Sequence, residues 1–69
     1  MREQLDRLVE EMLEKGVHYP DACREFERRF ITEALTRTNG NLGRTAQKLG
    51  IHRNTLSRKI AEYRLKNRR

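Results

Sequence analysis

Residues 41–60 read NLGRTAQKLGIHRNTLSRKI, and they predict two short helices joined by a tight turn. We expect the first helix over about 42–49 and the second over about 53–64. Gly50 stands where the first helix must end and the chain reverse, which favours a residue tolerant of positive φ. The small Ala46 would let two crossing helices approach closely, and four apolar residues would hold them together: Leu49, Ile51, Leu56 and Ile60. This arrangement is a helix-turn-helix.

Two longer helices are predicted before this stretch. From Arg2 to Lys15 the apolar residues recur at helical spacing, namely Leu5, Leu8, Val9, Met12 and Leu13. Pro20 suits the first turn of a second helix, which we expect to reach about Thr38. Its apolar residues form a wide stripe: Ala22, Cys23, Phe26, Phe30, Ile31, Ala34 and Leu35. The predicted fold class is therefore all-α, with four helices in one domain over residues 1–69.

The length of the chain predicts a homodimer. A domain of 69 residues buries only about 60% of its unfolded surface, so a monomer would be marginally stable. Cys23 is the only cysteine, which excludes a disulfide framework and a cysteine-rich zinc site. Oligomerisation is the remaining common route to burial, although the long second helix could also be an ordinary core helix. We expect the dimer interface to include Leu5, Leu8, Met12, Phe26, Phe30 and Ile31.

Charge is distributed unevenly along the chain. Residues 1–36 hold six Lys/Arg against nine Asp/Glu, whereas residues 37–69 hold ten against one, so −3 and +9 give the net +6. A basic half of this kind indicates a polyanionic partner; a solvated basic tail is the alternative. The sequence has no long apolar run that would indicate a transmembrane segment or secretory signal, and a free cysteine suits a reducing compartment. We expect a cytoplasmic protein with no membrane partner.

The last helix has one face suited to a nucleic-acid groove. Leu56, Ile60 and Tyr63 should face the core, which leaves Arg53, Asn54, Ser57, Arg58 and Ala61 on the opposite face. Arginine can bind guanine bidentately and asparagine can bind adenine, and residues at the start of such a helix reach deepest. We expect base reading by four residues, Arg53, His52, Asn54 and Ser57, with His52 also as the helix N-cap. Thr55, Arg58 and Lys59 lie beside this face, towards phosphates.

The start of the preceding helix suits a phosphate contact. Asn41 is a good N-cap, and it leaves backbone N–H groups near Gly43 free for a phosphate oxygen. The alternative is that these residues only make a turn. Other chemistry is not indicated, because His18 and His52 are isolated and Cys23 has no basic partner and should pack as a small hydrophobe. We expect no enzyme activity, no metal, no cofactor and no small-molecule substrate.

Several of these residues resemble the bacterial Fis-type helix-turn-helix. The similarity rests on Gly40-Asn41, Arg44-Thr45-Ala46, Leu49-Gly50-Ile51, Arg53-x-Thr55-Leu56 and Arg58-Lys59-Ile60. It is tight over about 39–63 and looser over 1–38. The same module closes the NtrC-like enhancer-binding activators that work with sigma-54 polymerase. The resemblance implies an intertwined homodimer, with dimerisation helices over 1–38 and the helix-turn-helix over 39–66. It also implies recognition helices closer than one DNA turn, so that the DNA bends or its central minor groove narrows.

The resemblance assigns roles residue by residue. Arg53 matches a guanine-reading arginine, and His52 takes the place of a base-contacting asparagine. Three residues match phosphate contacts: Asn41, Thr55 and Arg58. Ser57 and Gly43 depart from Fis, which has a long basic residue and a hydroxyl residue there, so base specificity should differ. The expected function is sequence-selective binding of double-stranded DNA, by a free-standing nucleoid-associated regulator or the C-terminal domain of an NtrC-like activator. The alternative is a basic helical protein- or RNA-binding module.

Overall fold

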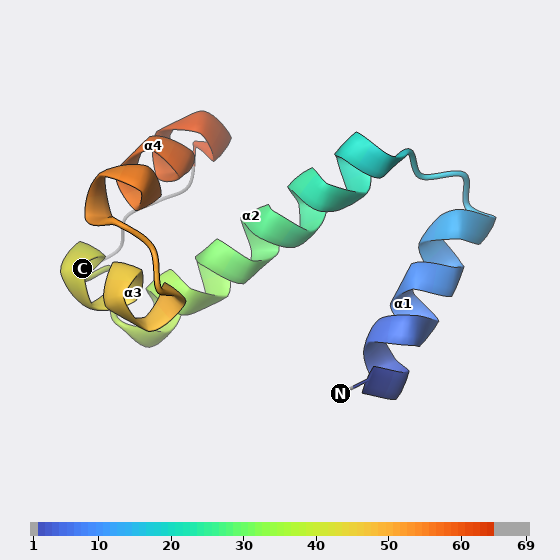
Figure 1. Cartoon of the computed structure of the whole chain (residues 1–69), viewed down its shortest axis with the longest axis horizontal. Helices are drawn as coiled ribbons and strands as arrows, with labels where there is room; N and C mark the ends of the chain where they lie inside the picture. Colours follow the sequence, from blue (N-terminus) through green and yellow to red (C-terminus); the bar gives the residue numbers. More distant parts are fainter. Residues whose placement is uncertain (1, 65–69) are drawn as a thin grey trace.

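A computed structural model describes residues 2–64 of the chain. Four helices occupy this range: α1 (Arg2–Glu14), α2 (Tyr19–Arg37), α3 (Leu42–Leu49) and α4 (Arg53–Tyr63) (Figure 1). The described part contains no strand, so the all-α prediction is confirmed, and no helix end differs from the expected one by more than one residue. No helix within residues 2–64 has the length and apolar character needed to cross a bilayer. The basic residues Lys66, Arg68 and Arg69 lie outside the described residues, as does the end of the 39–66 region.

The long α2 is the axis of the molecule. In Figure 1, α3 and α4 fold back over its C-terminal end, while α1 leaves its N-terminal end at an angle. The radius of gyration is 13.5 Å, against about 11 Å for a compact domain of this length. The chain alone is therefore more open than a self-sufficient globular domain.

The core lies where α2, α3 and α4 meet. The buried apolar residues are Ile31, Leu35, Ala46 and Leu56, and the partly buried residues packed on them are Leu42, Leu49, Ile51 and Ile60. Leu56 has no exposed surface. The helix α1 contributes no buried residue. The helix-turn-helix and the second half of α2 thus form one packed unit without α1.

The α2–α3 turn is held by hydroxyl groups and left-handed residues. Asn39 and Gly40 both have positive φ, at 55° and 80°. The fully buried Thr45 donates its hydroxyl proton to the carbonyl of Asn41 at 2.7 Å, so its oxygen accepts from the Thr38 hydroxyl. These bonds satisfy the only buried polar side chain among the described residues and fix where α3 begins.

A wide apolar groove of about 1360 Å³ separates α1 from the first half of α2. Its walls carry large side chains that are about half exposed, including Leu5, Leu8, Phe26 and Phe30. The two phenylalanine rings stack with centroids 5.4 Å apart. Nothing in residues 2–64 covers these side chains, so the chain leaves its most apolar surface open along one side.

Two residues take positions that differ from the expected ones. Ile31, expected at the dimer interface, is buried in the chain's own core with only 3% of its surface exposed. It packs with residues of α3 and α4 because it lies about 100° or more around α2 from the two phenylalanines. Cys23, expected to pack as a small hydrophobe, is exposed and lines the groove.

Candidate nucleic-acid interface

The first helix of the motif starts at a capped end. Asn41 has an extended backbone, and its side-chain oxygen accepts the Arg44 N–H at 3.0 Å. The predicted N-cap is therefore confirmed. This bond leaves the N–H groups of Leu42 and Gly43 at the helix start, where an α-helix supplies no partner of its own. A side chain at Gly43 would meet only the Asn41 side chain, at an ordinary 3.7 Å, so the glycine keeps this end open without being sterically required.

The turn between α3 and α4 closes as a Schellman motif. Gly50 has φ 71° and ψ 30°, the left-handed conformation that its position predicts. Its N–H donates to the Gln47 carbonyl at 3.2 Å, and the Ile51 N–H donates to the Ala46 carbonyl at 3.1 Å. Ile51 then packs on the core. The chain reverses in three residues, as a helix-turn-helix requires.

His52 caps the second helix of the motif, as predicted. Its Nδ1 accepts the Asn54 N–H at 3.0 Å, and its carbonyl accepts the Leu56 N–H at 3.0 Å. Leu56, one turn into α4, is the fully buried anchor of this helix. The start of α4 is therefore fixed both by a cap and by a core contact.

The outer face of α4 carries the expected set of polar side chains. Arg53, Asn54, Ser57 and Arg58 are all exposed, whereas Thr55 is half-buried. Neither arginine forms an ion pair with another described residue. From Leu42 to Tyr63 there are five Lys/Arg against Glu62 alone. The structure thus brings the predicted base-reading residues onto one open, cationic surface.

Lys59 differs from its neighbours because it is engaged within the chain. Its Nζ lies 2.7 Å from a Glu27 carboxylate oxygen, and the other oxygen of Glu27 accepts a hydrogen bond from the Tyr63 hydroxyl. The Lys59 hydrogen bond, followed by that of Tyr63, lowers the pKa of Glu27. The bond to Glu27 raises the pKa of Tyr63 to about 12. Lys59, predicted as a phosphate contact, is here a partner of α2.

Glu27 is not among the site residues predicted from the sequence. It lies between the two phenylalanines of α2, and its partners are 32 and 36 positions further along the chain. The only sign of this contact in the sequence is an acidic residue on one helix and basic residues on a later helix. That pattern is too common to identify a particular pair. Tyr63, expected to face the core, is half-buried and turns its hydroxyl to this carboxylate.

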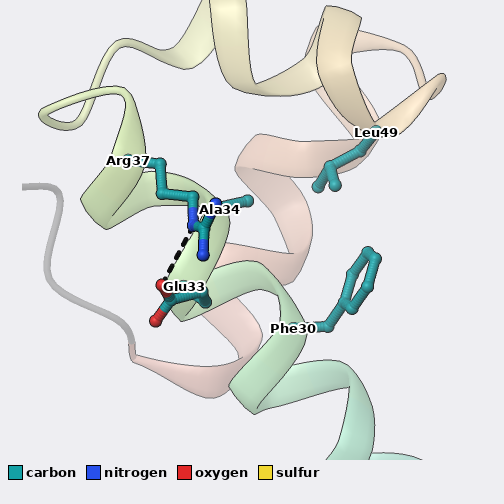
Figure 2. A pocket seen from close by; sticks show the side chains of 5 residues that line it. All are labelled: Phe30, Glu33, Ala34, Arg37 and Leu49. Carbon is teal, nitrogen blue, oxygen red and sulfur yellow. Dashed lines mark hydrogen bonds and ion pairs between the residues drawn. The ribbon is translucent and has the colours of Figure 1, made fainter. Parts of the chain in front are cut away.

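A small hollow lies beside the motif, between α2 and α3. Figure 2 shows Phe30 and Leu49 on either side of it, with Ala34 at its base. Glu33 and Arg37 flank it and pair at 3.1 Å. Its volume is about 240 Å³, and Phe30 also lines the larger groove. The open apolar surface therefore continues from the α1–α2 groove to the base of the helix-turn-helix.

Among residues 2–64, no group of three or more His, Cys, Asp or Glu side chains is placed to hold a metal ion. The exposed Cys23 contacts Tyr19, and this hydrogen bond raises the pKa of the tyrosine.

Comparison with known proteins gives a consistent result. The family model for bacterial regulatory proteins of the Fis family matches residues 22–63, which is the range from α2 to the end of α4. A protein of Xylella fastidiosa (strain Temecula1 / ATCC 700964), named as Fis-like and DNA-binding, is 45% identical over 45 residues. That alignment covers 65% of this chain and 50% of the relative, so the chain matches about half the length of this curated protein. No solved structure matches the chain significantly. On the family match over most of its length, the chain belongs to the Fis family of bacterial regulatory proteins.

Proposed function

We propose that the chain binds double-stranded DNA selectively as a homodimer, with each α4 in the major groove. The observation that carries this proposal is the outer face of α4, which is exposed and cationic and begins with Arg53. The buried Leu56 anchors the same helix to the core. The major groove is about 12 Å wide and admits one helix. The chain would act by binding rather than catalysis, in the cytoplasm and at the nucleoid. It would do so as a free-standing regulator or as the C-terminal domain of an NtrC-like activator.

The base contacts follow from the start of α4. Arg53 offers a guanidinium that can bind guanine O6 and N7, and Asn54 and the shorter Ser57 follow on the same face. His52 uses Nδ1 in the cap, so in the neutral ring its proton lies on Nε2. The ring would therefore present a donor to the DNA and favour an acceptor such as guanine O6, thymine O4 or a phosphate oxygen.

The phosphate contacts are proposed at the edges of this face. The start of α3 offers Asn41 and the N–H of Gly43, and α4 offers Thr55 and Arg58. Lys59 is the weakest of the proposed contacts, because a phosphate would have to compete with Glu27.

The proposed dimer partner is a second copy of the chain, seated on the apolar groove. The half-exposed Leu5, Leu8, Phe26 and Phe30 and the neighbouring Met12 form the proposed interface, and Ile31 is left out because the core already covers it. Two observations support a partner here: the groove is large and apolar, and the chain alone is too open for its length. The known dimers of the family add support, and with them the expectation that the DNA bends.

The test is selection from random duplexes followed by binding of variants. A homodimer should select a site with dyad symmetry. Arg53→Ala should lose about 1–3 kcal/mol on that site and much less on scrambled DNA. Arg7→Ala removes the same charge from α1, far from α4, and should leave both affinities nearly unchanged. Equal losses on selected and scrambled DNA for Arg53→Ala would contradict base reading.

A second comparison separates phosphate contacts from base contacts. Arg58→Ala should weaken selected and scrambled duplexes alike and reduce the salt slope of binding by about 1. Competition by duplex RNA at the same salt concentration tests the alternative function. If RNA competes as well as the selected DNA, the proposed DNA function is wrong.

A further inference from the structure

Glu27 makes a polar link between α2 and the recognition helix. Its carboxylate lies between Lys59, with Nζ at 2.7 Å, and the hydroxyl of Tyr63. We call Glu27, Lys59 and Tyr63 the α2–α4 bridge. Within residues 2–64, the hydrogen bonds and ion pairs that join side chains of these two helices all end on Glu27. The side chains of the ion pair are only about one third exposed.

The bridge holds the last turn of α4, beyond Ile60, which is the last residue of this helix packed on the core. Leu56, the buried anchor, is three residues from Arg53 and seven from Tyr63, which is about 4.5 Å and about 10.5 Å along the helix. The cap at His52 and the Schellman turn fix the first end, and the polar contacts of Glu27 add to the packing of Ile60 at the second. If α4 pivots at Leu56, a shift of about 2 Å at Tyr63 moves Arg53 by about 1 Å. A hydrogen bond to a base edge tolerates only a few tenths of an ångström.

The position of Glu27 on α2 connects this geometry to the dimer. Glu27 is the neighbour of Phe26, and both line the groove on which the second copy is proposed to sit. The bridge therefore joins the helix that would set the two-fold axis to the helix that would enter the DNA.

We propose that Glu27, through Lys59 and Tyr63, is a positioning residue that sets the spacing at which the two recognition helices read DNA. This inference rests on the proposed function, since it needs a dimer that reads two half-sites. Glu27 does not itself contact DNA in this role. Loosening the bridge should leave the base preference within each half-site unchanged. It should weaken the preference for one particular distance between the two half-sites.

The test uses the site selected by the unaltered protein, with the half-sites moved one base pair closer or further apart. The readout is the ratio of affinities for the selected and the shifted spacing. For the unaltered protein we expect a ratio of tenfold or more, about the loss of one good base contact. Tyr63→Phe and Glu27→Gln should lower it to about threefold or less. Both affinities in a ratio are measured on the same protein preparation. Partial unfolding of a variant lowers both by the same factor and therefore cancels in the ratio.

Two further variants make the result specific to the bridge. Glu25→Gln removes the same charge from the same helix, but Glu25 pairs only within α2, with Arg28 at 3.0 Å and Arg29 at 2.7 Å. It should keep the full ratio. The charge reversal Glu27→Lys with Lys59→Glu restores an ion pair and should recover the ratio lost by either single change.

The outcomes separate this inference from the proposed function. If the unaltered protein selects no dyad, the proposed function is wrong. Suppose instead that it selects a dyad of fixed spacing, but that Tyr63→Phe and Glu27→Gln show the same affinity ratio as the unaltered protein. Only the positioning inference is then overturned. An equal fall for Glu25→Gln would also overturn it, since the effect would then come from the charge of α2 in general.

Discussion

Replacing Phe26 with alanine should dissociate the proposed dimer, and the exposure of this side chain gives the size of the effect. Phe26 is 54% exposed in the single chain. An aromatic side chain offers about 200 Å² for burial, so about 110 Å² remain for a partner to cover. At about 25 cal/mol per Å², this surface is worth about 2.7 kcal/mol per copy. A dimer contains two copies, so the limit is about 5 kcal/mol, or three to four decades in Kd.

The assay is the mass of the protein as a function of concentration. The unaltered chain should approach twice the 8.3 kDa monomer mass at micromolar concentration, and Phe26→Ala should stay near 8.3 kDa. Thr32→Ala is the matched control, because Thr32 is an exposed residue of α2 outside the groove whose hydroxyl bonds only to the Arg28 carbonyl. It should dimerise like the unaltered chain.

Thermal unfolding adds an independent reading of the same prediction. A protein stabilised by self-association melts at a higher temperature when it is more concentrated. We expect this dependence for the unaltered chain and its loss in Phe26→Ala. A Phe26→Ala protein with an unchanged Kd would refute the assignment of Phe26 to the interface. An unaltered chain that stays at 8.3 kDa would refute the dimer itself.

Four further changes test local parts of the structure. His52→Ala removes the Nδ1 acceptor that caps α4 and should cost about 0.5–2 kcal/mol in denaturant unfolding, whereas His52→Asn should keep most of that stability. Gly50→Ala places a side chain at φ 71°, and the left-handed conformation should cost about 1–2 kcal/mol, seen as a lower melting temperature. The raised pKa of Tyr63 predicts stability that is complete below about pH 10 and is lost as the pH rises through about 12, and Tyr63→Phe should lack this alkaline loss in pH-dependent melts. The lowered pKa of Glu27 predicts the opposite direction, with stability lost as the pH falls below about 4.3, and Glu27→Gln should lack that acid loss.

The parts of the fold that follow from short-range rules could be predicted from the sequence. Asn41 and His52 cap their helices, and Gly50 adopts positive φ, because each depends on residues within a few positions. The outer face of α4 could be predicted by the same kind of rule, because helical spacing from the buried Leu56 determines which residues face away from the core.

The missed features depend on contacts between distant residues. Glu27 finds Lys59 and Tyr63 only because α4 folds back over α2, and no periodicity within either helix encodes that crossing. The assignment of Ile31 to the interface had a related cause. The apolar stripe of α2 is wide enough to serve two neighbours, and its width alone does not divide the residues between them.

The geometry of α2 makes that division once the core is known. At about 100° per residue, Phe26 and Phe30 lie about 40° apart on the helix, as do Ile31 and Leu35, and the two pairs are separated by about 100° or more. The second pair is buried under α3 and α4, and the first pair is about half exposed. One helix therefore has a core side and an open side. A substitution on the core side should unfold the helix-turn-helix at any concentration, whereas one on the open side should leave each motif folded and weaken only paired binding. DNA binding would fall in both cases. Raising the protein concentration should restore binding after a substitution on the open side and not after one on the core side, and this measurement distinguishes the two sides of α2.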